Sequence, residues 1–310
     1  MKVAIAGPGD LSKYQVEELQ KKSVEVVVLA RSRKEWYENK EGVDFRLVDF
    51  TSLDSLVEAL KDCDGLVSTI LDYSETNVTI HNLLIDAMLK TPKCRKFIPS
   101  EYGSDLLNYP DQPSFYYFCH NPIREKLRAL PKGEDQLQYT LLSTGYLADY
   151  FNPSSNRYIK DFDMFPLNLK EKTLTIPGTG DELVSFTSTR DIAKAITNLF
   201  LSNEPWEDIT FIAGETNSWN KILPAYLSDL DLTVTKVSLT DIVKEIVEGN
   251  AEKDQDKIYS GEFKLWVASH ALGLPADLVA KQKAKFFSDI HFHTIAEVRK
   301  AAEAGPEFIV

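Results

Sequence analysis

VAIAGPGDLS, residues 3–12, places a short apolar run directly before two closely spaced glycines and the polar start of a helix-like pattern. This order of strand, tight turn and helix is the context in which glycines predict a dinucleotide-binding turn. Gly7 is expected to adopt backbone angles that other residues avoid, and Gly9 to let a pyrophosphate approach the helix N-terminus. Ser12 occupies the position of the usual third glycine. The alternative is an ordinary strand-to-helix turn without a ligand.

The alternation of strands and helices continues beyond this turn. Apolar positions at helical spacing separate the β-branched runs, and each connection is long enough to contain a helix. The predicted strands cover residues 24–30, 45–48, 65–70, 96–99 and 139–142. We therefore predict an α/β fold in which residues 1–151 form a Rossmann-type, doubly wound parallel sheet that binds NAD(P).

The pattern changes after residue 151, where aromatic and polar residues are followed by mostly helical periodicity. We predict a smaller, mostly helical, substrate-binding lobe made of residues 152–173 and 216–310. Residues 174–215 are expected to return to the dinucleotide-binding domain. A cleft between the two lobes is the expected ligand site.

Composition excludes several classes of protein. The chain has 310 residues, 43% of them hydrophobic, and a net charge of -12, which disfavours an extended surface for nucleic acid or anionic membranes. Three cysteines without a CxxC pair are typical of reduced thiols, and we expect no metal site. No signal-peptide pattern follows Met1. We expect a cytoplasmic monomer or homodimer whose partner is a small-molecule substrate, with no nucleic-acid or membrane partner.

The end of the second predicted strand indicates which cofactor is bound. NAD-binding domains place a carboxylate here for the ribose hydroxyls. This chain instead has Arg31, Ser32, Arg33 and Lys34, with no acidic residue before Glu35. Cations and a hydroxyl at this position suit a 2′-phosphate, so NADP(H) is predicted over NAD(H). The alternative is a solvated basic loop.

Several segments resemble the NmrA-like group of atypical short-chain dehydrogenases, which includes enzymes of the isoflavone reductase and phenylcoumaran reductase type. The most specific is KFIPSEYGSD, residues 96–105, which is similar to the F-x-P-S-E-F-G-x-D segment of that family with Tyr for Phe. Further similar segments cover residues 28–32, 48–50, 67–70, 139–146, 176–178 and 190–193.

The resemblance implies that NADPH lies across the carboxyl ends of the strands, with a metabolite in the cleft. The implied reaction is hydride transfer to an aromatic or alkaloid-like compound of secondary metabolism. The expected cofactor-binding residues are Gly7, Gly9, Leu11, Ser12, Arg31, Ser32, Lys34, Asp49, Phe50, Thr69, Ser100 and Glu101. The expected substrate-binding residues are Tyr102, Gly145, Tyr146 and Phe151.

One departure from the family concerns the proton donor. The reductases carry a Lys four residues before an Arg, and counting back from Arg124 lands on His120. A histidine titrates near neutrality, so His120 is a candidate proton donor. Tyr116 would share its helical face if the helix began early enough, but Pro122 favours a later start, near residue 121. Cys119 is not expected to pair with His120, because adjacent side chains diverge.

Three functions remain open on this sequence. The first is an NADP(H)-dependent reductase in which His120 donates the proton. The second is a redox-neutral isomerase, rearrangement or cyclisation catalyst that uses His120 as a Brønsted acid. The third is a non-enzymatic, dinucleotide-sensing regulator of the NmrA type, because a cofactor site beside altered catalytic residues would suit that role.

Overall fold

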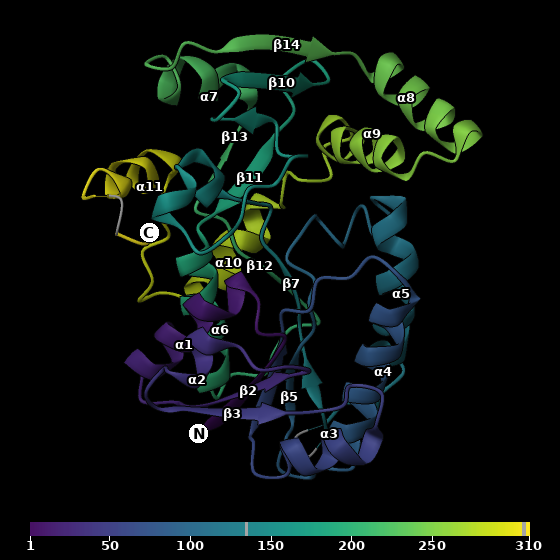
Figure 1. Ribbon diagram of the computed structural model, residues 1–310, viewed down its shortest axis with the longest axis vertical. Helices are drawn as coiled ribbons and strands as arrows, with labels where there is room; N and C mark the ends of the chain where they lie inside the picture. Colours follow the sequence, from purple (N-terminus) through teal and green to yellow (C-terminus); the bar gives the residue numbers. More distant parts are fainter. Residues whose placement is uncertain (134–135, 306–307) are drawn as a thin grey trace.

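A computed structural model of the chain describes residues 1–133, 136–305 and 308–310, which form two stacked lobes (Figure 1). The lower lobe contains a parallel six-stranded sheet in the order β3-β2-β1-β4-β5-β6. Its strands are β1 (Lys2–Ala6), β2 (Glu25–Ala30), β3 (Val43–Leu47), β4 (Gly65–Ser68), β5 (Lys96–Ile98) and β6 (Gln138–Tyr139). The predicted Rossmann-type α/β fold is confirmed.

Helices pack against both faces of this sheet. They are α1 (Asp10–Lys21), α2 (Glu35–Glu38), α3 (Leu53–Leu60), α4 (Glu75–Leu89), α5 (Ser114–Arg128) and α6 (Thr189–Leu201). Alternate residues of β1 enter different cores: Ala4 and Ala6 pack with α3, α4 and α5, whereas Val3 and Ile5 pack with α1 and α6. Because side chains alternate along a strand, β1 must be apolar on both sides. This explains the continuous apolar run before Gly7.

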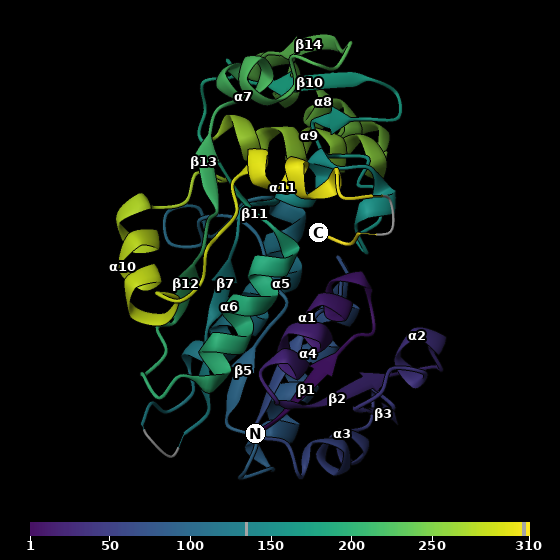
Figure 2. The ribbon, with the colours of Figure 1, turned by 90° about the vertical axis from the view of Figure 1, so that its left-hand side faces the viewer.

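The C-terminal part of the chain also returns to the lower lobe. Strand β7 (Leu141–Ser143) pairs in parallel with β12 (Ile209–Phe211), and α10 (Ala276–Phe286) packs beside α6 (Figure 2). Phe286, Phe287 and Phe292 lie in the core on the α1 and α6 face of the sheet. Residues of the segment 216–310, which the sequence assigns to the smaller lobe, thus cover the apolar face of α6.

The upper lobe contains two three-stranded sheets and four helices among the described residues. One sheet holds β8 (Tyr146–Leu147), β11 (Val184–Thr187) and β13 (Glu215–Asn217); the other holds β9 (Leu167–Asn168), β10 (Thr173–Pro177) and β14 (Thr233–Val237). The helices are α7 (Trp219–Tyr226), α8 (Leu239–Glu252), α9 (Gln255–Ala268) and α11 (Ile295–Ala302), and the 3-10 turns are η1 (Ala148–Phe151) and η2 (Ser154–Asn156).

An aromatic core joins these pieces. Phe151, Phe165, Phe186 and Trp219 pack edge to face or tilted, with ring centroids 5.4–5.9 Å apart. Such contacts add to the hydrophobic stabilisation of burying large rings. Within the described part of the chain, no helix combines the length and apolar character that crossing a bilayer demands.

Candidate functional site

Gly7 forms the tightest part of the turn between β1 and α1. Its φ is +99°, and a Cβ at this position would lie 3.0 Å from the Ile70 side chain and 3.2 Å from the Thr69 carbonyl carbon. Only glycine accommodates both the backbone angle and the close contact. The Thr69 hydroxyl donates to the Gly7 carbonyl at 2.5 Å. The end of β4 therefore holds the turn in place.

Gly9 leaves space at the start of α1. It is the N-cap of the helix, and among the described residues nothing beyond its neighbours lies within 4 Å of the position of a Cβ. The N–H groups of Asp10 and Leu11 have no carbonyl partner inside the helix, and they contribute to its positive end. Lys13 Nζ lies 3.3 Å from the Asp10 carboxylate and reduces its repulsion of an anion. The turn therefore fits a pyrophosphate.

Ser12 occupies the third-glycine position and is fully buried. Its hydroxyl donates to the Gly9 carbonyl at 2.7 Å and lies 2.5 Å from the Tyr37 hydroxyl. Tyr37 is on α2, 28 residues along the chain from Gly9, and its hydroxyl also donates to the Gly9 carbonyl. Sequence reasoning missed this contact, because no local motif connects the two positions.

The basic loop after β2 is exposed. Within residues 1–133, 136–305 and 308–310, Arg33 pairs with Glu38 at 2.6 Å, whereas Arg31 and Lys34 have no carboxylate partner. The loop therefore holds two cations without internal neutralisation, next to the turn described above. Their charge and position fit a 2′-phosphate.

Asp49 and Phe50 follow β3. Both the hydroxyl and the backbone N–H of Thr51 donate to the Asp49 carboxylate, and these hydrogen bonds lower its pKa. Phe50 is buried in the core between the sheet and helices α3, α4 and α5. The Phe50 side chain is thus enclosed within the protein. Asp49 is exposed, and both hydrogen bonds from Thr51 go to its Oδ1, so Oδ2 has no partner among the described residues.

The Ser100-Glu101 segment follows β5 and is tied to α5. The Glu101 carboxylate accepts two hydrogen bonds from Arg124, at 2.9 and 2.8 Å, and both side chains are 1% exposed. Burial opposes the charge of Glu101, but the Arg124 guanidinium holds its pKa below the usual range. The Glu101 carboxylate therefore anchors the segment, and the Ser100 and Glu101 carbonyls face Tyr116 and His120.

Helix α5 begins at Ser114, seven residues before the start that Pro122 favours. Glu262, on α9, accepts hydrogen bonds from the Ser114 hydroxyl and the Phe115 N–H and thereby caps the helix. The carbonyl that loses its donor to Pro122 belongs to Phe118, whose side chain is on the exposed side of the helix. Tyr116 and His120 therefore share a helical face, and their rings stack 3.6 Å apart.

His120 is buried, and both of its ring nitrogens have protein neighbours. Nε2 lies 3.1 Å from the Ser100 carbonyl, and Nδ1 lies 3.0 Å from both the Tyr116 carbonyl and the Cys119 sulfur. The expectation that Cys119 and His120 diverge is wrong. Burial raises the pKa of Cys119 to about 11 and lowers that of His120. The pair is thus a neutral thiol beside a neutral imidazole, which does not constitute an activated nucleophile.

The four expected substrate-binding residues lie mainly in packed surroundings. Tyr102 donates from its hydroxyl to the Ser68 carbonyl at 2.8 Å. A Cβ on Gly145 would lie 2.0 Å from the Ser185 carbonyl oxygen, so Gly145 is required for packing. Phe151 belongs to the aromatic core. Tyr146 is buried, and its hydroxyl has no hydrogen-bond partner among the described residues.

Tyr73, in the β4–α4 loop, was missed by sequence reasoning. Its ring packs against Phe115 at 5.0 Å, Tyr259 at 6.0 Å and Tyr116 at 6.3 Å. Burial raises its pKa to about 12, and its hydroxyl makes no hydrogen bond within the described residues. The signal was available, because the loop after β4 lies at the carboxyl edge of the sheet, where ligands bind in this fold.

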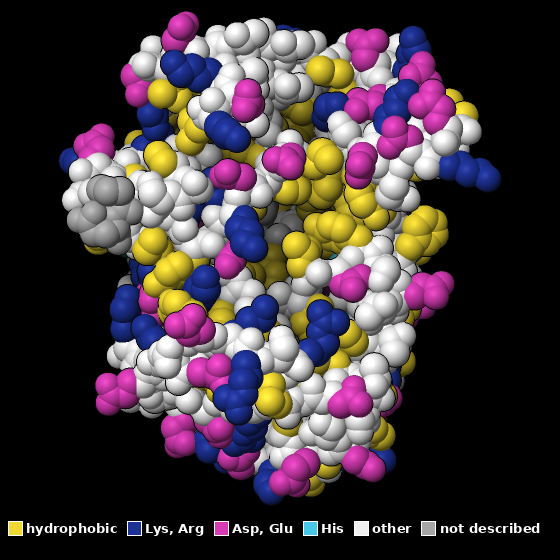
Figure 3. All heavy atoms as spheres, viewed as in Figure 1, with side chains coloured by type: hydrophobic (Ala, Val, Ile, Leu, Met, Phe, Trp, Pro, Cys, Tyr) yellow, Lys and Arg dark blue, Asp and Glu magenta, His cyan; other side chains and the backbone are white. Residues whose placement is uncertain are grey.

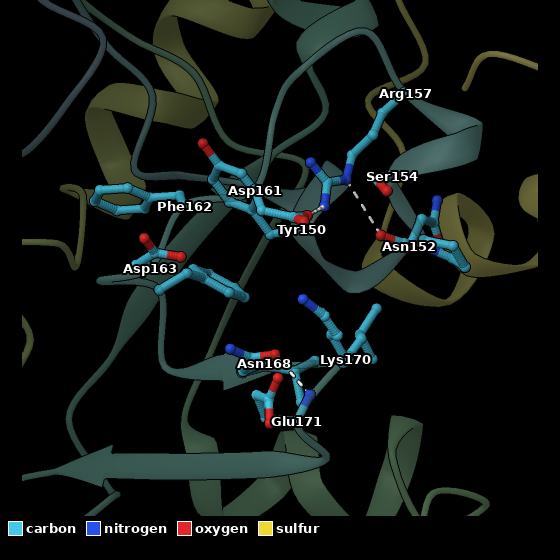
Figure 4. A pocket seen from close by; sticks show the side chains of 14 residues that line it. Tyr150, Asn152, Ser154, Arg157, Asp161, Phe162, Asp163, Asn168, Lys170 and Glu171 are labelled. Atoms are coloured by element: carbon cyan, nitrogen blue, oxygen red, sulfur yellow. Dashed lines mark hydrogen bonds and ion pairs between the residues drawn. The ribbon is translucent and has the colours of Figure 1, made fainter.

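Hydrophobic side chains gather along one side of a hollow between the two lobes, and charged side chains lie at its opposite edge (Figure 3). A separate cavity of about 480 Å³ lies in the upper lobe, where Arg157 packs over the Tyr150 ring at 5.4 Å (Figure 4). Its other charged lining residues are Asp161, Asp163, Lys170 and Glu171. This lining carries both signs of charge, and none of the residues expected to bind substrate is part of it.

Comparisons with known proteins agree with this geometry. Residues 7–165 match a family model described as NAD(P)H-binding. The chain is 40% identical to "Oxidoreductase swnR" of Arthroderma benhamiae, over 100% of both chains. It is 24% identical to phenylcoumaran benzylic ether reductase 1 of Arabidopsis thaliana, over 79% of this chain and 80% of that protein.

A solved structure shows the same fold at low sequence identity. The complex of leucoanthocyanidin reductase with NADPH from Vitis vinifera superposes with a TM-score of 0.70 at 15% identity. The match covers 96% of this chain and 97% of that one. The similarity therefore extends across both lobes and is not confined to the glycine turn.

Proposed function

Because this chain belongs to the NAD(P)H-binding, isoflavone reductase-like family, we propose that it is an NADPH-dependent reductase of a small aromatic or alkaloid-like metabolite. The observation that carries the cofactor assignment is the pair of cations, Arg31 and Lys34, left without carboxylate partners beside an open glycine turn. A relative named for the reduction of phenylcoumaran benzylic ethers supports an aromatic substrate, and we extend the proposal to a reaction of secondary metabolism.

The cofactor would be held by the turn and the basic loop. The N–H groups of Asp10 and Leu11 would bind the pyrophosphate, and Arg31, Ser32 and Lys34 the 2′-phosphate. Bound NADPH supplies a hydride. The role of the protein is to place a substrate against it and to exclude water from the site.

Aromatic side chains beside the carboxyl edge of the sheet support the substrate class. Tyr73, Phe115 and Tyr259 pack with centroids 4.5–6.0 Å apart, and Phe162 and Phe263 continue the cluster from the upper lobe. Aromatic rings bind flat apolar molecules, and their faces also attract cations. A planar aromatic compound or a nitrogen heterocycle would fit such a wall.

His120 is the proposed proton donor. Its Nδ1 can accept from the Cys119 thiol, in which case Nε2 carries the hydrogen and donates it to the Ser100 carbonyl. To protonate a substrate, this hydrogen must be released from Ser100. A neutral imidazole can supply it, in the role that a lysine has in the related reductases, if Nδ1 takes up the proton of the Cys119 thiol at the same time, so that the ring stays neutral and the proton lost overall is that of the thiol. The free hydroxyl of Tyr73 makes this residue the competing donor.

Variants at both positions test the proposal. NADPH oxidation would be followed by nicotinamide absorbance with a panel of aromatic enones, benzylic ethers and cyclic imines. We expect His120→Ala to lower kcat at least about 100-fold without changing the Kd for NADPH. Tyr73→Phe should change the KM for the substrate more than kcat.

Two results would contradict these assignments. Unchanged kcat in His120→Ala, together with a large loss in Tyr73→Phe, would assign proton donation to Tyr73. Failure of the wild-type protein to bind NADPH below about millimolar concentration would exclude the reductase itself, because that limit corresponds to only about 4 kcal/mol of binding free energy.

A further inference from the structure

We propose that the Tyr37 hydroxyl is a positioning group that ties the phosphate turn to the basic loop and thereby sets the preference for NADPH. Tyr37 lies outside every expected cofactor-binding segment, and its side chain is buried, so it does not contact a ligand itself. It acts through Gly9 on one side and through Lys34 on the other. The inference rests on cofactor binding and is independent of the proton donor.

Three oxygens form a closed triangle at the start of α1. The Gly9 carbonyl oxygen is 2.5 Å from the Tyr37 hydroxyl and 2.7 Å from the Ser12 hydroxyl, and the two hydroxyl oxygens are 2.5 Å apart. The two hydroxyl hydrogens serve these three contacts, so one of them donates to the Gly9 carbonyl and the other either to the same carbonyl or to the neighbouring hydroxyl. A carbonyl held by this pair of hydroxyls is fixed in orientation, and so is the peptide that follows it. That peptide carries the Asp10 N–H, the first donor available to a phosphate.

The backbone of Tyr37 completes the link. Its N–H donates to the Lys34 carbonyl at 3.0 Å, and Lys34 is the N-cap of the four-residue helix α2. So short a helix is marginal on its own and depends on tertiary packing. The Tyr37 ring supplies that packing: it lies 4.8 Å from Trp36 and 6.3 Å from Phe45. One side chain therefore positions both ends of the cofactor site.

This arrangement also accounts for the missing third glycine. In dinucleotide-binding turns that residue permits close packing of helix and strand. Here a serine hydroxyl occupies the space, and burying it without partners would be costly. Tyr37 and the Gly9 carbonyl satisfy it. Ser12 and Tyr37 thus act as a pair, and each requires the other.

The test is binding of NADPH and NADH to the purified full-length protein, followed by nicotinamide fluorescence. We expect Tyr37→Phe to raise the Kd for NADPH about tenfold, as expected for the loss of a buried hydrogen bond. The Kd for NADH should rise less, because only NADPH carries the 2′-phosphate that the basic loop would contact. Ser12→Ala should act in the same direction.

Tyr226→Phe is the matched control. It removes a tyrosine hydroxyl that donates to Glu215 at 2.9 Å in the upper lobe, and it should leave both Kd values unchanged. Equal losses of NADPH and NADH affinity in Tyr37→Phe, or no loss, would overturn the proposal. If Tyr37→Phe does not fold, two other measurements decide the question. They are cofactor binding by Ser12→Ala and hydrogen exchange of residues 31–38 in the wild-type protein, with and without NADPH. NADPH must slow exchange in that segment more than NADH does.

Discussion

Arg31 and Arg33 are two residues apart in one exposed loop, but their surroundings differ. Arg33 has a carboxylate partner in Glu38, whereas Arg31 has none among the described residues. A paired guanidinium is partly neutralised, and binding an anion would require it to leave or share its partner. Arg31 is therefore the better candidate for the 2′-phosphate, although the sequence offers both residues equally.

This difference leads to a matched pair of variants. Arg31→Ala should weaken NADPH binding by about 2 kcal/mol, or roughly 30-fold in Kd, because a charge-assisted hydrogen bond is lost. NADH binding should stay unchanged. Arg33→Ala should alter neither Kd more than about threefold. Calorimetric titration of both cofactors would measure these effects, and a retained NADPH preference in Arg31→Ala would refute the assignment.

At the scale of elements, α4 is fixed to the sheet by a buried histidine. His81 is fully buried, with Nδ1 2.9 Å from the Asn77 carbonyl and Nε2 2.9 Å from the Ser68 hydroxyl at the end of β4. The neutral ring satisfies both contacts if Nδ1 donates and Nε2 accepts. Protonation would place a second donor and an uncompensated charge in the core. Burial accordingly lowers the pKa of His81 from 6.5 to about 4.

The lowered pKa makes stability depend on pH. Between pH 6.5 and 4 the unfolded chain binds a proton at His81 and the folded chain does not, so stability falls as pH falls, by about 3 kcal/mol across the window. His81→Gln should lose less stability between pH 7 and 4.5, as measured by urea unfolding. Burial raises the pKa of Asp149 to about 6, so this carboxyl group makes stability rise as pH falls over the same range. The informative measurement is therefore the difference between the variant and the wild type.

His270→Asn is a control for this experiment. His270 is exposed, and asparagine tolerates its positive φ of 68°. The control should follow the wild-type dependence on pH. If His81→Gln follows it as well, the buried histidine does not account for the acid sensitivity.

Elements governed by neighbouring residues could be predicted from the sequence, and those governed by distant contacts could not. The turn at Gly7 could be predicted because the need for a positive φ is a local property. The burial of β1 could be predicted from its apolar run. The start of α5 depends instead on Glu262, which is 148 residues from Ser114 in the chain. The Tyr37 contact with Gly9 is non-local as well. The glycine turn and the basic loop could therefore be proposed as a cofactor site from the sequence, and that assignment stays a prediction, whereas the contacts that depend on tertiary structure were missed.

At the scale of the whole molecule, the lobes are interwoven. Asp149, at the start of the upper lobe, accepts a hydrogen bond from the Thr189 N–H at 2.7 Å and one from the Tyr14 hydroxyl at 3.4 Å. These contacts connect η1 to α6 and α1. Farther along, the chain passes through α7, α8 and α9 and then returns to cover α6 with Phe286 and Phe287. The dinucleotide-binding core is therefore incomplete until nearly the end of the chain.

A core completed by its C-terminal residues should lose stability when one of them is truncated. Phe287 is fully buried, and Phe287→Ala should lower the free energy of unfolding by about 3–5 kcal/mol through lost burial and a cavity beside α6. Phe308→Ala, at a residue 48% exposed, should change it by less than about 0.5 kcal/mol. Because the lobes share this core, tryptophan fluorescence and NADPH release should report one urea midpoint in Phe287→Ala, lower than that of the wild type. Two separate midpoints would mean that the upper lobe folds independently. An unshifted midpoint would mean that α6 does not depend on the packing of Phe287.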